Sequence, residues 1–255
     1  MNVIGVIPVR MKSSRLPGKA MKKMHGMPMV GHVYYRSKLS RSLNDVYVAT
    51  CDKKIKNYIE SIKGKVIMTS KRHKRAVDRT QEAVKKISKE NKKKIKYVVM
   101  IQGDEPCLEP KMINQVVNVI KKNKKIKISN LYTIMKSQEE ILDPNRVKVV
   151  VDKKNNAIYF SREKISTKKI KGKKIYYKQG NVFCFTKKSL NNFVKLQESD
   201  FEITESVDMN RLIENRDKIK MVRTKFNTVN VDTQSDFNKA VKLIKKDKYF
   251  KKYSK

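Results

Sequence analysis

Short apolar runs recur along the first hundred residues, and each is followed by a stretch with apolar positions at helical spacing. The runs predict strands at residues 2–9, 45–50, 65–69 and 96–102. Unbroken apolar runs are typical of strands buried on both faces, as in a parallel sheet. The stretches that follow the runs predict helices at residues 29–41, 53–62, 78–90 and 109–123. This alternation predicts an α/β fold with a mostly parallel sheet.

The pattern changes after residue 145. Residues 145–162 contain two apolar runs joined by the polar segment DKKNN, which predicts an antiparallel hairpin. Further strands are expected at residues 181–185, 219–224 and 228–232, and helices at residues 202–215 and 233–246. Thr233 and Ser235 are the candidate N-caps of the last helix. The basic tail, residues 246–255, is expected to be frayed. With no repeat and no long linker, we expect one domain over residues 1–255, with residues 145–185 as an antiparallel insertion.

The chain is strongly basic, with 62 Lys and Arg against 24 Asp and Glu and a formal net charge of +38 in 255 residues. Such an excess favours nucleic-acid binding, because clustered cations displace counterions from phosphates. Here the charge is mostly lysine and is dispersed from end to end, as on a solvated surface. Aromatic residues do not interleave with a basic stripe, as stacking of single strands would require. Nucleic-acid binding is therefore a minor alternative.

Three cysteines, Cys51, Cys107 and Cys184, are far apart and form no CxxC pair. This argues against a disulfide framework and a structural zinc site, and favours a reducing compartment. The first apolar run is too short, and too closely followed by Arg10, for a signal peptide. No stretch reaches the roughly 18 apolar residues of a membrane helix. We expect a cytoplasmic protein without a membrane partner.

Residues 7–19, IPVRMKSSRLPGK, place three cations beside Gly18 directly after the first predicted strand. Ligands of open α/β sheets bind beyond the carboxyl ends of the strands. Glycine lets the backbone approach phosphate oxygens, and the cations Arg10, Arg15 and Lys19 offset their charge. The Walker pattern is absent. The segment predicts a triphosphate-binding loop, and a solvated basic turn is the alternative.

Two aspartates follow predicted strands farther along the chain, Asp104 in IQGDEP and Asp232 in NVDTQSDF. Each alone is more often a turn or capping residue. Together they suit one Mg²⁺, which takes few protein carboxylates and completes its oxygen shell with substrate phosphates. Combined with the cationic loop, the two aspartates favour a magnesium–triphosphate site.

The segments around these residues resemble the 3-deoxy-manno-octulosonate cytidylyltransferases, the CMP-Kdo synthetases. The matching segments follow the order and spacing of that family over nearly the whole chain: IPVRMKSSRLPGK, HKRAVDR, IQGDEP, DPNRVKVVVDKKNNAIYFSR, FEITESVDMNRLIEN and VNVDTQSDF. The resemblance implies a Rossmann-like nucleotidyltransferase fold. It also implies the Mg²⁺-assisted condensation of CTP with a 3-deoxy-octulosonic acid, with release of pyrophosphate, in lipopolysaccharide biosynthesis.

The resemblance assigns roles to matching positions. It implies catalytic roles for Lys19, Asp104 and Asp232, and metal binding by the two aspartates. It implies phosphate or nucleotide binding by Arg10, Arg15, Lys19, Arg79 and Gln102. It places Gln102, Arg162 and Glu205 on the sugar side, and Arg211 at a basic position of the family. Residues 145–185 match the dimerisation and sugar-side element, so a homodimer is expected. In the implied reaction the anomeric hydroxyl attacks the α-phosphorus in line, and metal on the aspartates lowers the pKa of that hydroxyl.

The chain departs from the family pattern on the base and sugar sides. The family's H-x-S-G-T-acid-Arg reads His73-Lys-Arg-Ala-Val-Asp-Arg79 here, and the proline after YFSR is missing. Residues 178–185 lack the family's histidine and both tyrosines. A CMP-synthetase for another acid, such as an acylneuraminate relative, and an inactive homologue therefore stay open. The basic loop 71–75, KRHKR, either binds an anionic substrate or is an exposed basic loop.

Overall fold

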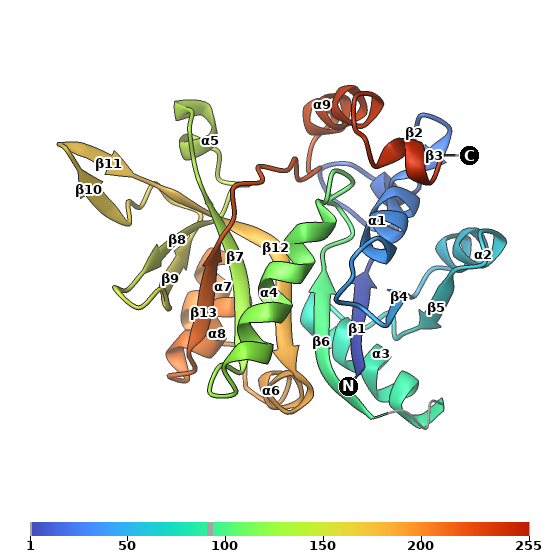
Figure 1. Ribbon diagram of the computed structural model, residues 1–255, viewed down its shortest axis with the longest axis horizontal. Coiled ribbons are helices and arrows are strands. Elements are labelled where there is room, and N and C mark those ends of the chain that lie inside the picture. Colours follow the sequence, from blue (N-terminus) through green and yellow to red (C-terminus); the bar gives the residue numbers. More distant parts are fainter. Residues whose placement is uncertain (1, 91–93, 255) are drawn as a thin grey trace. The chain divides into compact units, whose positions relative to one another are not determined.

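The computed structural model describes residues 2–90 and 94–254 (Figure 1). The chain divides into two compact units, which are described here one at a time. The first consists of Met1–Asn114 and Thr228–Lys255, and the second of Gln115–Asn227. The single domain expected over residues 1–255 stays a prediction.

The first unit is built on four parallel strands. They are β1 (Asn2–Pro8), β4 (Asp45–Thr50), β5 (Lys65–Met68) and β6 (Ile95–Ile101). They pair in the order β6-β1-β4-β5. Val6, Val48 and Val98 are fully buried, as expected of strands that are covered on both faces. All four strands were predicted within one residue at each end.

Helices follow the strands of this unit. They are α1 (Met29–Lys38), α2 (Lys53–Ser61), α3 (Ala76–Glu90) and α9 (Gln234–Lys245), while α4 (Pro110–Lys122) contains the boundary between the units. Shorter elements are η1 (Lys19–Met21), β2 (Lys23–Met24), β3 (Met27–Pro28) and η2 (Phe250–Lys252). Thr233 is the N-cap of α9: its hydroxyl accepts from the backbone of Asp236, whose carboxylate accepts from the backbone of Thr233. This predicted cap is confirmed.

Two predictions for residues 228–254 of this unit are wrong. Residues 228–232 form no strand, although the Val231 amide donates to the Asp104 carbonyl at 2.9 Å. Residues 246–254 of the basic tail are not frayed, and Lys255 lies outside the described residues. Tyr249 and Tyr253 are each only 9% exposed. The tail is ordered because these aromatic rings are buried. The prediction of a frayed tail considered only its lysines.

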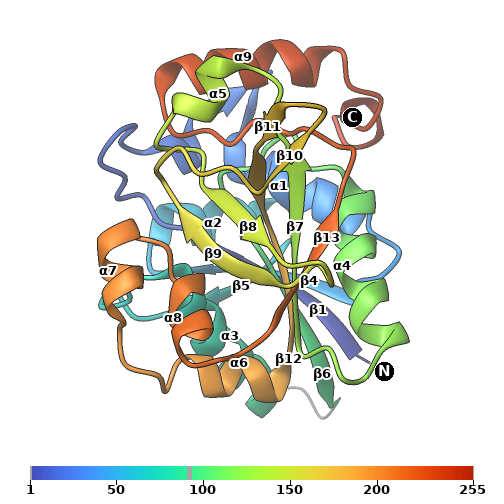
Figure 2. The ribbon, with the colours of Figure 1, turned by 90° about the vertical axis from the view of Figure 1, so that its left-hand side faces the viewer.

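The second unit combines parallel and antiparallel strands: β7 (Ile128–Ile134), β8 (Lys148–Val151), β9 (Ala157–Ser161), β12 (Tyr177–Thr186) and β13 (Ile219–Arg223). β13 pairs in parallel with β7, and β12 pairs antiparallel with β7 and β8. β8 and β9 form the predicted antiparallel hairpin, with Val149 opposite Phe160 (Figure 2). The α/β fold class, mostly parallel with an antiparallel hairpin, is confirmed.

The remaining elements of the second unit are short. They are α5 (Gln138–Leu142), α6 (Lys187–Phe193), α7 (Asp200–Glu205), α8 (Met209–Glu214), β10 (Lys168–Ile170) and β11 (Lys173–Ile175). The single helix predicted at 202–215 is wrong. Ser206 takes the left-handed conformation, with φ 50° and ψ 43°, and this divides the segment into α7 and α8. Within the part of the chain that the structure describes, no helix is long and apolar enough to cross a membrane.

Candidate active site

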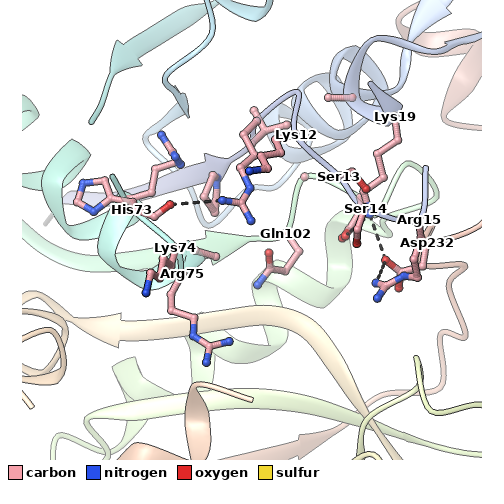
Figure 3. Close-up of a pocket in the computed structure, with 18 of the residues that line it drawn as sticks. Lys12, Ser13, Ser14, Arg15, Lys19, His73, Lys74, Arg75, Gln102 and Asp232 are labelled. Carbon is pink, nitrogen blue, oxygen red and sulfur yellow. Dashed lines mark hydrogen bonds and ion pairs between the residues drawn. The ribbon is translucent and has the colours of Figure 1, made fainter. Parts of the chain in front are cut away.

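A cavity of about 400 Å³ lies in the first unit, where β1 and β6 end side by side. Parallel strands put their carboxyl ends at one edge, which is the usual ligand site of such sheets. A Cβ at Gly103 would lie 3.0 Å from the Val9 Cβ, so glycine lets the two strand ends approach. The lining residues are Pro8–Arg10, Lys12–Arg15, Lys19, Ala20, Met29, His73–Ala76, Arg79, Gln102–Asp104 and Asp232 (Figure 3).

Lys19 joins the two aspartates of this cavity. Its Nζ donates to Asp104 Oδ2 at 3.0 Å, to Asp232 Oδ1 at 3.1 Å and to the Val231 carbonyl at 2.7 Å. Gly18, at φ 69°, forms the left-handed turn from which η1 and Lys19 begin. Burial lowers the pKa of Lys19, but the two carboxylates outweigh it, and the net pKa is raised. The ammonium therefore stays charged between two acids that are 128 residues apart in sequence.

Asp232 also receives Arg15, whose guanidinium donates to Asp232 Oδ1 at 2.7 Å. Asn230 donates to the other carboxylate oxygen at 2.6 Å. Burial raises the pKa of Asp232, but Lys19 and Arg15 together outweigh burial and hold this pKa below its usual value. Asp232 is therefore an ionised carboxylate with both oxygens hydrogen-bonded.

Asp104 is held differently from Asp232. Its Oδ2 accepts from Lys19, whereas its Oδ1 is buried and has no hydrogen-bond partner among the described residues. Burial, together with the charge of Asp232, raises the pKa of Asp104 against the opposing effect of Lys19. A buried carboxylate oxygen without a donor is costly unless another group, such as a cation, reaches it.

These two carboxylates fit a magnesium ion that binds together with substrate. The described residues contain no group of three or more His, Cys, Asp or Glu side chains that could hold a metal by themselves. Mg²⁺ is commonly bound through one or two carboxylates, with water and substrate phosphates as the other ligands. The unpartnered oxygen of Asp104 suits that mode. The metal role of Asp104 and Asp232 stays a prediction.

The loop at residues 70–75 forms another side of the cavity, and Glu82 of α3 holds it. The Glu82 carboxylate accepts from the Ser70 amide at 2.9 Å, contacts His73 Nε2 and pairs with Lys86 at 2.8 Å. Burial opposes the charge of Glu82, but these hydrogen bonds lower its pKa to about 2. The His73 carbonyl accepts from Arg10 at 3.5 Å. Sequence reasoning missed Glu82; only its spacing of four residues from Lys86 was visible as a helical ion pair.

Arg79 and Gln102 complete the set of nucleotide-binding candidates. Arg79 is 3% exposed, donates from NH1 to the Thr69 hydroxyl, and carries an NH2 group without a hydrogen-bond partner among the described residues. Gln102 follows β6 and lines the same cavity (Figure 3). The structure thus brings together the predicted residues Arg10, Arg15, Lys19, Arg79, Gln102, Asp104 and Asp232. Their individual roles stay predictions.

Arg162 and Glu205 lie in the second unit and contact each other. Glu205 accepts from the Tyr159 hydroxyl, the Ser161 hydroxyl and the Arg162 amide at 2.7–2.8 Å. Burial opposes its charge, but these donors outweigh burial and lower the pKa of Glu205. The Arg162 guanidinium donates to the carbonyls of Glu205 at 2.8 Å and Pro144 at 2.9 Å. Both side chains thus fasten β9 to the end of α7, and their role in sugar binding stays a prediction.

Arg211 forms an ion pair with another carboxylate of the second unit. Its guanidinium binds both oxygens of Glu202, with NH2 at 2.7 Å from Oε1. The two residues are 4% and 0% exposed. This bidentate pair ties α8 to α7.

Comparisons with known proteins identify the family. A family model described as cytidylyltransferase matches residues 4–221. A 3-deoxy-manno-octulosonate cytidylyltransferase of Thermodesulfovibrio yellowstonii is 38% identical over 252 residues, covering 96% of this chain and 98% of its own length. An 8-amino-3,8-dideoxy-manno-octulosonate cytidylyltransferase of Shewanella pealeana is 37% identical over 237 residues, covering 92% and 96%. A solved structure of a CMP:2-keto-3-deoxy-manno-octonic acid synthetase complexed with CTP matches with a TM-score of 0.87 and 30% identity, covering 96% and 99%.

The chain has a mostly parallel α/β fold with a cationic cavity at its strand ends. Together with the similarity to these relatives, this identifies it as a nucleotidyltransferase. More narrowly, the chain belongs to the cytidylyltransferase family. The resemblance found in the sequence is confirmed.

Proposed function

We propose that this enzyme activates a 3-deoxy-octulosonic-type sugar acid with CTP, giving the CMP-sugar and pyrophosphate. The observation that carries the proposal is the bridge from Lys19 to Asp104 and Asp232 beside Arg15, at the strand ends of the first unit. The arrangement supports binding of a triphosphate together with a divalent cation. The names of the relatives support the nucleotide and the acid.

In the proposed reaction, the anomeric hydroxyl oxygen of the acid forms a bond to the α-phosphorus of CTP. The bond from that phosphorus to the bridging oxygen breaks, pyrophosphate leaves with the electron pair, and the hydroxyl proton passes to solvent. Arg10 and Arg15 bind the phosphates and offset their charge. The ammonium group of Lys19 gives up hydrogen bonds to the carboxylates and donates to phosphate oxygens instead. When bound by Asp104 and Asp232, Mg²⁺ would neutralise phosphate charge and lower the pKa of the attacking hydroxyl. Positioning and electrostatics thus supply most of the catalysis.

The identity of the acid is the finer part of the proposal. Relatives named for 3-deoxy-manno-octulosonate and for its 8-amino-3,8-dideoxy form match this chain at 38% and 37% identity. The 8-amino acid is therefore a second candidate. An acylneuraminate and a nucleic-acid partner are not favoured, because neither is named among these relatives.

We also propose that the enzyme is a cytoplasmic homodimer in which residues 145–185 contribute to the interface. Exposed apolar side chains support self-association of the second unit: Ile158 of β9 is 51% exposed, and Phe201 and Ile203 of α7 are 48% and 59% exposed. The mass in solution tests this part. A dimer that Ile158→Lys converts to a monomer supports it, and a monomeric wild type contradicts it.

The function is tested by pyrophosphate release from CTP and Mg²⁺ with each acid in turn. We expect release with 3-deoxy-manno-octulosonate or its 8-amino form, and none when CTP is replaced by ATP. Absence of release with every sugar acid would contradict the proposal.

A further inference from the structure

Asp232 reaches the site from a segment without regular secondary structure. Residues 228–232 form neither helix nor strand, and the chain re-enters the first unit where this segment begins. Asp104, in contrast, closely follows a strand of the parallel sheet. Yet Asp232 is only 5% exposed and accepts hydrogen bonds from Arg15 and Lys19 (Figure 3). Contacts other than strand pairing must therefore fix this segment.

Two hydrogen bonds fasten the segment to the residues that follow β6. The Thr228 hydroxyl donates to Glu105 Oε2 at 2.5 Å, and the Val231 amide donates to the Asp104 carbonyl at 2.9 Å. Val231 is fully buried, and its carbonyl accepts from the ammonium group of Lys19 at 2.7 Å. The segment is thus held near both of its ends by two consecutive residues, Asp104 and Glu105.

Glu105 is a buried carboxylate that the proposed reaction does not use. It is 3% exposed and is not among the described residues that line the cavity. Among the described residues no three acidic side chains are grouped so that they could hold a metal, so Glu105 is not a third ligand beside Asp104 and Asp232. A buried carboxylate is costly unless it is hydrogen-bonded, and hydrogen bonds to an ionised acceptor are among the strong ones. Glu105 is therefore suited to hold a neighbouring segment in place.

We propose that Glu105 is a positioning residue, which through Thr228 sets where Asp232 stands in the site. The separation of the two candidate metal ligands, Asp104 and Asp232, then depends on a contact that touches neither substrate. Misplacement of a reacting group by about 1 Å can cost about 100-fold in rate, so such a contact matters. This inference rests on the proposed function for the role of the metal, but not for the placement of Asp232.

The test compares variants that differ by one hydroxyl. Thr228→Val removes the donor and keeps the shape of the side chain, whereas Thr228→Ser keeps the hydroxyl. Ser40→Ala is the matched control, because it removes another buried hydroxyl of the first unit, which donates to Asn114 at 2.8 Å. Adding Thr228→Val to Glu105→Ala should change little further, since two residues that act through one contact are not additive.

The first readout is the gain in affinity for inorganic tripolyphosphate that Mg²⁺ provides, measured by calorimetry with Mg²⁺ and with EDTA. We expect Thr228→Val to reduce this gain by about five-fold or more, and Thr228→Ser and Ser40→Ala to change it less than about two-fold. The affinity in EDTA should stay close to that of the wild type, because the cationic loop keeps its charges. Thermal melting of each variant separates lost placement from lost folding.

The second readout is the crystal structure of each variant, which needs neither metal nor turnover. The contact of 3.1 Å between Lys19 Nζ and Asp232 Oδ1 should be lost in Thr228→Val and kept in Ser40→Ala. An unmoved Asp232 in Thr228→Val would overturn the proposal, and so would an equal loss of the Mg²⁺-dependent gain in the control. A wild type without turnover, or without such a gain, would contradict the proposed function or its metal. The crystallographic comparison would then still decide whether Glu105 places Asp232.

Discussion

The ammonium group of Lys19 lies 3.0 Å from one oxygen of Asp104, while the other oxygen of that carboxylate is buried without a hydrogen-bond donor among the described residues. Only one carboxylate oxygen of Asp104 is thus hydrogen-bonded, whereas both oxygens of Asp232 are. This asymmetry leaves one carboxylate oxygen to which a bound cation could supply the missing partner. In the proposed complex, substrate phosphates and Mg²⁺ would supply the partner that the protein side chains do not give to this oxygen.

Lys19→Met should remove the charge that joins the two aspartates and that we propose binds the leaving pyrophosphate. We expect kcat/KM for CTP to fall by at least about 100-fold, because a preorganised cation near developing charge contributes this much. Lys23→Met, on the exposed face of β2, is the matched control and should keep full activity. Steady-state pyrophosphate release measures both. Activity of the Lys19 variant within a few-fold of wild type would contradict the role given to Lys19.

Glu82→Gln should loosen the loop at residues 70–75 and change how stability depends on pH. The pKa of Glu82 is lowered to about 2 in the folded protein from its ordinary value of 4.5. Its charge therefore stabilises the fold above about pH 4.5, by about 2 kcal/mol, and this contribution is lost as pH falls toward about 2. Urea unfolding should show the gap between wild type and variant constant above about pH 5 and closing below about pH 4.5.

Glu60→Gln is the control for this measurement, since Glu60 pairs with Lys56 on the exposed surface of α2. It should change the free energy of unfolding by less than about 0.5 kcal/mol. A gap between Glu82→Gln and wild type that does not narrow on acidification would show that the Glu82 carboxylate does not stabilise the loop through its charge.

Tyr253→Phe tests the ordered C-terminal tail. His32 Nε2 donates to the Met24 carbonyl at 2.9 Å, and burial lowers the His32 pKa to about 4, so the ring is neutral at pH 7. Its Nδ1, 3.0 Å from the Tyr253 hydroxyl, then accepts from it, and the same hydroxyl accepts from Arg36 at 3.2 Å. Loss of the hydroxyl should cost about 1–3 kcal/mol of stability, with kcat unchanged. An unaltered unfolding midpoint would mean that the tail is not held through this hydroxyl.

Glu205→Gln tests whether Glu205 is structural. The amide can accept only through one oxygen, so it cannot satisfy the three donors that the carboxylate now receives from Tyr159, Ser161 and Arg162. We expect the free energy of unfolding to fall by about 1–3 kcal/mol. A raised KM for the sugar acid with unchanged stability would instead favour direct sugar binding. Circular dichroism melts and steady-state kinetics distinguish the two outcomes.

The sequence predicts the first unit well because its strands are unbroken apolar runs and its helices are amphipathic. It does not predict β7 (Ile128–Ile134), where Ser129, Asn130 and Thr133 interrupt the apolar pattern but are buried. Ser129 and Asn130 are tolerated there because they donate to backbone carbonyls. Such pairing depends on residues far along the chain, which periodicity cannot report.

The site divides in the same way. Asp104 and the cationic loop follow predicted strands that the structure confirms, so parallel topology was enough to expect these two together. Asp232 lies beside them although residues 228–232 form no strand, because the Val231 amide donates to the Asp104 carbonyl. The contact of Glu82 with His73 depends on how one loop folds over α3, and no spacing rule gives it. The sequence also could not show that the Arg162 guanidinium donates its hydrogen bonds to backbone carbonyls.

The most direct measurement is pyrophosphate release from CTP, Mg²⁺ and 3-deoxy-manno-octulosonate, or its 8-amino form, by Asp104→Asn and Asp232→Asn. Asp45→Asn, which alters an exposed partner of Lys65, is the control. We predict that both site variants stay folded and lose at least about 100-fold in turnover, while the control keeps it. Full activity of both site variants would contradict a metal-assisted transfer at these two carboxylates.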